Sequence, residues 1–185
     1  MVIQGDRIVL RLLLPSDFAK IVQWTKDPNV GHYMDDDGCP EVLGDCEAWY
    51  NELRRNRLNL RLIIATLDGL AIGDIELDHI TWRSGEAELR IRIGEGAYRG
   101  KGYGTEAITA LLIHAFDQMK LSQIYLRVAS NNLAAIRCYE KVGFRKEGRL
   151  VRNASQPGLQ REIYLMRICK DEFTPKHACW HRQVG

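Results

Sequence analysis

The sequence predicts an α/β domain with a mixed sheet of about seven mostly antiparallel strands, flanked by about four helices. Hydrophobic residues recur at every second position in some segments and at every third or fourth in others, in the order β-α-α-β-β-β-α-β-α-β-β. One strand–helix–strand crossover, between residues 86 and 130, should make two strands parallel. The length of 185 residues fits one domain. We expect that domain at residues 1–173 and a flexible tail at residues 174–185.

The chain opens with a strand and two helices. Residues 8–12 alternate as a strand, and Pro15-Ser16-Asp17 then provides a helix start. Asp27-Pro28 should end this first helix, because the residue before a proline is pushed away from helical angles. After an acidic segment, a second helix is expected at about residues 42–56.

Three strands follow as a meander. Residues 60–66 and 71–80 are rich in β-formers and are joined near Asp68-Gly69, a signal for a tight turn. Residues 86–93 alternate strictly, which puts apolar side chains on one face and charged side chains on the other. The charged ones are Glu86, Glu88, Arg90 and Arg92.

The second half of the chain contains the crossover. An apolar stripe at residues 108–119 predicts a helix, and residues 124–128 alternate as the next strand. A last helix is expected within residues 130–143, with an asparagine cap at its start and a glycine at its end. Two final strands, at about residues 145–152 and 160–168, complete the sheet.

The composition argues against several classes of protein. Lys and Arg total 26 and Asp and Glu total 24, so the net charge of +2 does not predict nucleic-acid binding. Five scattered cysteines without a Cys-x-x-Cys pair indicate neither a disulfide framework nor a zinc site, and no metal is expected. Charges near the N-terminus and the lack of a run of about 20 apolar residues argue against a signal peptide and a membrane span. We therefore expect a cytoplasmic protein with reduced thiols.

A glycine-rich run, residues 99–105, separates the strand at 86–93 from the next helix. Its three glycines lie where backbone N–H groups are unpaired and the helix dipole favours negative charge, which makes an anion cradle. An arginine and a lysine in the run add positive charge. A purely structural turn is the alternative. The Walker A and Rossmann spacings are both absent, because Thr105 does not follow a Gly-Lys pair and position 107 is alanine.

The run Arg99-Gly100-Lys101-Gly102-Tyr103-Gly104 resembles the acetyl-CoA pyrophosphate loop of the GNAT superfamily of N-acetyltransferases, Arg/Gln-x-x-Gly-x-Gly/Ala. The segment from Asn132 to Phe144 resembles the second signature of that family, Asn-x-x-Ala-x-x-x-Tyr-x-x-x-Gly-Phe. The resemblance extends over residues 8–168. It implies the GNAT fold with its parallel pair splayed apart, acetyl-CoA as co-substrate, and direct acetyl transfer to a primary amine in a ternary complex.

The resemblance also implies which residues bind the cofactor. Backbone groups of the splayed strand would bind the pantetheine arm and polarise the thioester carbonyl, and the glycine run would hold the pyrophosphate. The expected cofactor-binding residues are Ile91, Arg92, Ile93, Arg99, Gly100, Lys101, Gly102, Tyr103, Gly104, Thr105 and Asn132. For Asn132, an ordinary helix cap is the alternative.

Two residues are candidates for proton transfer. Alkyl amines are protonated at neutral pH, so a base or a water relay must take a proton, and Glu88 on the charged strand face is the candidate base. A solvated carboxylate is its alternative. Tyr139 matches the family tyrosine that protonates the departing thiolate, with a buried aromatic as its alternative. A covalent route through Cys138 is not expected, because no histidine lies near it in the sequence.

The sequence leaves the acceptor amine open. The acceptor site of this fold is walled by the first two helices and their connection, where carboxylates can hold a cation. The candidates are Asp35, Asp36, Asp37 and Glu41, with a solvated acidic loop as the alternative. Polyamines, protein N-termini and aminoglycoside-like amines all remain possible acceptors. A non-catalytic acyl-CoA-binding sensor is the alternative function, and a homodimer is expected from the family alone.

Overall fold

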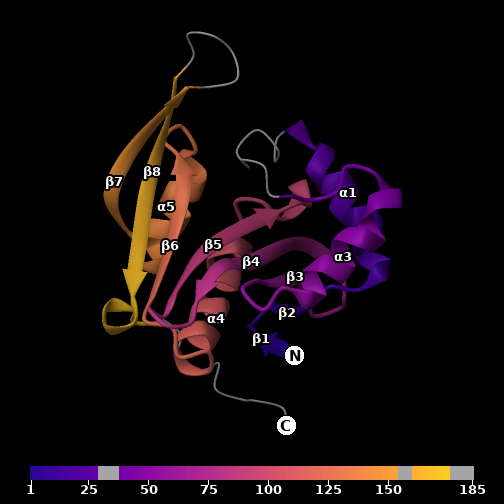
Figure 1. The fold of residues 1–185 in the computed structure, drawn as a ribbon, viewed down its shortest axis with the longest axis horizontal. Helices are drawn as coiled ribbons and strands as arrows, with labels where there is room; N and C mark the ends of the chain where they lie inside the picture. The colour runs from indigo at the N-terminus through magenta and orange to yellow at the C-terminus, as the bar shows by residue number, and fades with distance from the viewer. Residues whose placement is uncertain (29–37, 154–159, 176–185) are drawn as a thin grey trace.

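The computed structural model describes residues 1–28, 38–153 and 160–175, and it contains one eight-stranded sheet in the order β1-β2-β3-β4-β5-β6-β8-β7 (Figure 1). Neighbouring strands are antiparallel except β5 and β6, which are parallel as predicted. The strands are β1 (Val2–Gln4), β2 (Ile8–Leu12), β3 (Leu60–Thr66), β4 (Ala71–Thr81), β5 (Glu86–Ile93), β6 (Gln123–Ala129), β7 (Arg145–Asn153) and β8 (Gln160–Cys169).

The sheet has one strand more than the sequence predicts. The additional strand is β1, which pairs with β2 at the edge of the sheet. Its three residues are too few to show an alternating pattern, so the hydrophobic period alone misses it.

Four α-helices have both ends within the described residues. They are α1 (Phe18–Lys26), α3 (Cys46–Arg55), α4 (Tyr103–Asp117) and α5 (Leu133–Val142). The helix predicted at residues 42–56 begins with a 3₁₀ turn, Leu43–Asp45, before α3. None of the helices in the described parts of the chain is long and apolar enough to cross a membrane.

Alternate residues of β3 divide between two hydrophobic cores. Leu62 and Ile64 belong to the larger core, which α4 and α5 cover. Ile63 and Ala65 belong to a smaller core with Trp24 of α1 and partly buried side chains of α3. Because successive side chains of a strand point to opposite faces, the sheet separates α1 and α3 from α4 and α5.

The parallel strands form a fork. Strands β5 and β6 pair from Glu86↔Gln123 to Glu88↔Tyr125, and residues 89–93 continue β5 without a partner on β6. Figure 1 shows the two strands diverging, with β6 turning away to pair along its length with β8. Backbone groups at the open side of β5 are therefore available to an incoming ligand, as the splayed pair predicted from the resemblance requires.

Candidate active site

The glycine run lies at the mouth of the fork and is tied to the end of β5 by Arg99. The Arg99 guanidinium donates from Nε to the carbonyl of Ile93 at 2.8 Å and from Nη2 to the carbonyl of Gly94 at 2.6 Å. It also bonds to the Asp27 carboxylate at 2.8 Å. Arg99 thus fixes the position of the loop and places a positive charge at its base.

Two glycines of the run adopt backbone angles that other residues avoid. Gly100 has φ +71° and Gly102 has φ +85°, and Gly102 caps the start of α4. Gly104 lies inside the first turn, where an added Cβ would find its nearest neighbour at 3.8 Å. The protein itself therefore does not require a glycine at 104, and the small residue leaves open the approach to the unpaired amides of the first turn.

Arg7 is a site residue that the sequence does not reveal. Its guanidinium stacks 4.4 Å from the ring centre of Tyr103 and donates to the Lys101 carbonyl at 3.1 Å. A second contact, from Nε to Glu106 at 2.8 Å, holds it against the first turn of α4. Arg7 follows β1, far away in the sequence, so only the folded sheet brings this second cation to the glycine run.

The end of β5 presents its two faces to different surroundings. Ile91 and Ile93 point toward α4, and their side chains lie 3.9 and 3.8 Å from the position of a Cβ on Gly104. Arg92 points to the opposite face, where its side chain is 2% exposed and bonds to Asp74 at 2.6 Å. Of the three predicted residues, Arg92 can therefore meet a cofactor in the fork only through its backbone.

The second signature forms the start and body of α5. Asn132 caps this helix, accepting a hydrogen bond from the Ala135 amide at 3.2 Å, as predicted for a cap. Tyr139 is buried and packs edge-on against Phe144. A tyrosine hydroxyl is protonated at neutral pH, and burial raises the pKa of Tyr139 further above its ordinary value. It is in the protonation state that an acid requires.

Cys138 lies beside the glycine run but is a poor nucleophile. Its sulfur is 3.3 Å from the Thr105 hydroxyl, and burial raises the pKa of the thiol. Because the reactive form of cysteine is the thiolate, this environment argues against a covalent acetyl-cysteine.

Glu88 lies at the point where the fork opens, and it is not a solvated carboxylate. The residue is 4% exposed, and Arg127 donates to both of its oxygens at 2.8 and 2.9 Å. Arg90 and His79 lie 3.7 and 3.8 Å from Oε2. Glu88 is therefore a buried, paired member of the charged face of β5.

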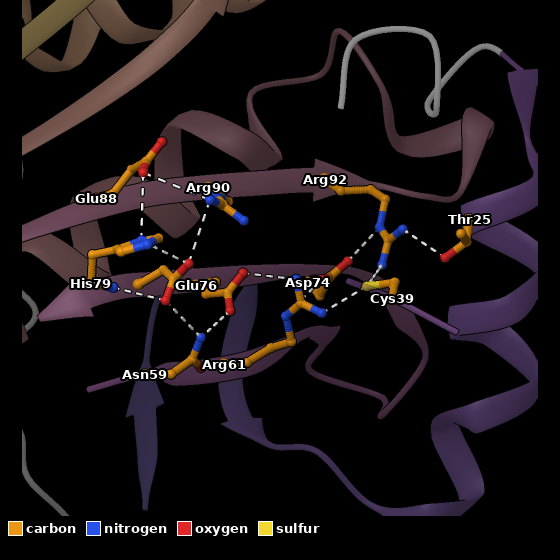
Figure 2. Close-up of polar contacts among 11 residues, drawn as sticks. Thr25, Cys39, Asn59, Arg61, Asp74, Glu76, His79, Glu88, Arg90 and Arg92 are labelled. Carbon is orange, nitrogen blue, oxygen red and sulfur yellow. Dashed lines mark hydrogen bonds and ion pairs between the residues drawn. The ribbon is translucent and has the colours of Figure 1, made fainter. Parts of the chain in front are cut away.

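The pairing of β3, β4 and β5 arranges these charges as a stripe under α1 and α3 (Figure 2). Because directly opposite residues of antiparallel strands share a face, Asp74 meets Arg92, Glu76 meets Arg90 and Asp78 meets Glu88. Figure 2 shows this polar network continuing to β3 and to Thr25 of α1. We call these β4 and β5 residues, with Arg61 of β3 and Asn59 just before that strand, the charged stripe.

A pocket of about 230 Å³ opens between α3 and the charged stripe. Its acidic lining residues are Glu52, Glu76 and Asp78, and it is also lined by Gly38, Trp49, Leu53, Asn56, Asn59 and Arg61. Burial raises the pKa of Glu76. Asn59 donates to both Glu76 and Asp78 and so links the two carboxylates.

Of the four predicted acceptor residues, the structure describes one, Glu41. Asp35, Asp36 and Asp37 are outside the described residues, and Glu41 is exposed and does not line the pocket. The sequence did contain a signal for two of the pocket acids, because acids at positions 74, 76 and 78 alternate within an otherwise apolar strand. Within the described ranges, no group of three His, Cys, Asp or Glu side chains can hold a metal ion.

Comparisons with known proteins agree with the fold. A family model described as an acetyltransferase (GNAT) domain matches residues 7–145. A spermidine N(1)-acetyltransferase of Vibrio cholerae is 28% identical over 169 residues, which cover 91% of this chain and 96% of that protein. An aminoglycoside N(6')-acetyltransferase type 1 of Klebsiella pneumoniae is 27% identical over 155 residues, covering 78% and 77%.

Solved structures of spermidine N-acetyltransferase are also similar to this chain. The spermidine N-acetyltransferase of Vibrio cholerae, crystallised with CoA and spermine, superposes with a TM-score of 0.82 at 27% identity and covers 91% of this chain and 98% of its own. A dodecameric structure of that enzyme superposes with a TM-score of 0.78 at 26% identity, covering 90% and 96%.

Proposed function

Because the chain belongs to the acetyltransferase (GNAT) family, we propose that it transfers the acetyl group of acetyl-CoA directly to a primary amine of a polyamine. The main observation in favour of a polyamine as acceptor is the acidic pocket beside the charged stripe. A polyamine has several cationic nitrogens, so one can occupy this pocket while another reaches the fork. A relative acting on spermidine and a relative structure holding spermine support the same class.

The residues present fit coenzyme A, which would supply the acetyl thioester. Beyond Glu88 the fork leaves β5 without a strand partner on its β6 side, although the Ile93 carbonyl accepts from Arg99, and Gly104 leaves room beside the first-turn amides where a side chain would intrude. Arg7 and Lys101 give the cradle positive charge for a diphosphate. Asn132, at the start of α5, is proposed to bond to the pantetheine arm.

Two residues are proposed to serve the reacting groups. Tyr139 donates its proton to the departing thiolate, which needs an acid to become the free thiol. Glu88 places a negative charge where the acceptor ammonium approaches the fork, and its two bonds to Arg127 fix that charge in position. Direct attack on the thioester needs no covalent enzyme intermediate, in keeping with the protonated state of the Cys138 thiol.

The experiment is turnover with acetyl-CoA and a panel of spermidine, an aminoglycoside and a peptide with a free N-terminus, followed by thiol release. We expect the highest kcat/KM for spermidine. Substituting Glu52→Gln should raise the KM for spermidine about three- to tenfold at unchanged kcat, because it removes binding common to ground and transition states. Glu47→Gln, also exposed on α3 but outside the pocket lining, is the matched control.

The alternative outcomes are distinct. If the protein acetylates the aminoglycoside or the peptide faster than spermidine, the proposal of a polyamine acceptor is wrong. The acetyltransferase activity would still stand. Measurable CoA binding without turnover of any amine would favour a non-catalytic sensor. Three further expectations stay predictions: a homodimer, a cytoplasmic location and a separate tail from residue 174. Sedimentation would test the homodimer. Most of the tail, from residue 176, lies outside the described residues.

A further inference from the structure

The geometry points to His79 as the base that removes the proton from the acceptor amine. This inference needs only the reaction of the family and not the choice of a polyamine. His79 lies on β4 beside the opening of the fork, with its Nδ1 3.8 Å from Oε2 of Glu88. Figure 2 shows its ring directed toward Glu88. Its side chain is 63% exposed, whereas Glu88 beside it is buried, so the imidazole is the group that a substrate can reach.

The backbone at His79 departs from the conformation of an ordinary strand, and this local irregularity positions the imidazole ring. The pairing of β4 with β5 is irregular between Asp78 and Thr81, and His79 has φ +51°. That conformation is uncommon for residues other than glycine. Both oxygens of Asp78 then hold the residue, one accepting from its amide at 2.7 Å and the other contacting Nδ1 at 3.0 Å.

The contact with Asp78 prepares the histidine for catalysis. When Nδ1–H donates to a carboxylate, the proton-free nitrogen of the neutral ring is Nε2, which can accept a proton. Asp78 is itself held by Asn59 at 3.2 Å and by Arg90 at 3.4 Å. It also lines the acidic pocket, so a single carboxylate connects the cation-binding surface with the proposed base.

Glu88 is less suited to accept this proton. Its two oxygens receive the Arg127 hydrogen bonds, and Arg90 lies close to the same carboxylate. The carboxylate is therefore both buried and engaged by arginine side chains, which keeps a substrate amine away from its oxygens. Glu88 instead contacts Nδ1 of His79 at 3.8 Å, and it is a positioning residue in this scheme.

The proton and electron pairs balance in the following way. The acceptor ammonium gives one proton to Nε2 of His79, and the freed nitrogen pair attacks the thioester carbonyl. Collapse of the tetrahedral adduct breaks the C–S bond, and the thiolate takes a proton from Tyr139. The attacking nitrogen loses its second proton to water, the tyrosinate is reprotonated from water, and the exposed imidazolium returns its proton to solvent. One proton is released per acetyl group transferred.

Chemical rescue of His79→Gly tests this assignment. Glycine accepts φ +51° at no steric cost, so the variant should fold, and it leaves space for free imidazole. With the amine that the unmodified protein acetylates fastest, we expect kcat to fall about 100-fold while CoA affinity stays within about twofold. Added imidazole should restore at least about tenfold of the lost rate.

The matched control is Lys120→Gly, at the other described non-glycine residue with positive φ, in the turn before β6. It relieves the same kind of backbone strain and should leave kcat unchanged with or without imidazole. A His79→Gly rate within about threefold of the unmodified protein would overturn the assignment. A large loss that imidazole does not reverse would also overturn it, because the residue would then act only through structure.

Discussion

Arg127 of β6 donates two hydrogen bonds to Glu88 of β5, at 2.8 and 2.9 Å, across the point where these strands separate. Backbone pairing between the strands ends at Glu88↔Tyr125. The side-chain pair therefore holds together the two arms of the fork just beyond the last backbone pair.

Replacing Arg127 with methionine should lower the free energy of unfolding by about 1.5–3 kcal/mol, because a buried carboxylate loses its charged donors. Urea unfolding measures the loss. Arg145→Met is the control, since Arg145 pairs with Glu172 at the surface with a side chain 73% exposed. It should cost less than about 1 kcal/mol. Equal losses in both variants would mean that the pair at the fork is no more important than a surface pair.

Two glycines of the cradle should respond oppositely to alanine. Gly104→Ala should keep or slightly increase stability, because its Cβ has space and alanine favours helix. It should nevertheless weaken CoA binding at least about tenfold by obstructing the first-turn amides. Gly102→Ala should lower stability by about 1–2 kcal/mol, because its φ is +85°. Calorimetric titration with CoA measures the binding effect, and thermal unfolding measures the stability effect. An unchanged CoA affinity in Gly104→Ala would contradict the proposal that the diphosphate binds at this position.

Trp24 packs directly on the backbone of Gly94 at the end of β5. A Cβ on Gly94 would lie 2.2 Å from the indole ring, so Gly94→Ala should destabilise the protein by about 1–3 kcal/mol. Gly96→Ala, where an added Cβ meets nothing within 4 Å, should change stability by less than about 0.5 kcal/mol. Chemical denaturation of the pair provides the comparison, and similar midpoints would contradict the close packing.

Glu95 gives the fold a defined dependence on pH. Hydrogen bonds from Lys20 and Trp24 lower the pKa of Glu95, so its contribution is present above the ordinary carboxyl pKa and is lost as pH falls through the lowered value. Glu95→Gln should be less stable than the unmodified protein at neutral pH, and the difference should narrow below about pH 4. Urea midpoints across this range test the trend. A difference that is constant with pH would show that charge is not its source.

Tyr139→Phe should lower kcat about 100-fold or more, because the thiolate loses its proton donor, while CoA affinity stays nearly constant. Since burial raises the pKa of the hydroxyl, no loss of activity from its ionisation is expected on the alkaline side of neutrality. Tyr164→Phe on β8 is a control outside the second signature. Stopped-flow thiol release and CoA titration give the two quantities. An unchanged kcat would exclude Tyr139 as the acid.

The hydrophobic period predicts most of the elements, and two signature segments predict the cofactor loop and its partner helix. The hydrophobic period predicts these elements because each of them buries one face. The spacing of the buried residues can be read from the local sequence. The surroundings of Glu88 could not be predicted in this way. Its partner Arg127 comes from the next strand of the sheet, on the far side of the crossover, so the sequence shows a charged strand face but not what covers it.

Dependence on tertiary contacts also explains why other features of the candidate site could not be predicted from the sequence. Arg7 meets Tyr103 only after β2 has packed beside the meander, and the role of His79 depends on a local irregularity in strand pairing. Neither feature has a periodic signature. The alternating acids at 74, 76 and 78 could have been recognised, because charged residues within a buried strand need partners or a function.

The pocket acids also differ in how freely they can change. Glu76 bonds to Arg61 at 2.7 Å inside the charged stripe, and Asp78 contacts His79, so substitutions at either would disturb the sheet along with the proposed acceptor site. Glu52 lies on the exposed side of α3. Divergence in acceptor preference among descendants of this protein is therefore expected to begin on that helix, while the strands keep the reaction chemistry constant.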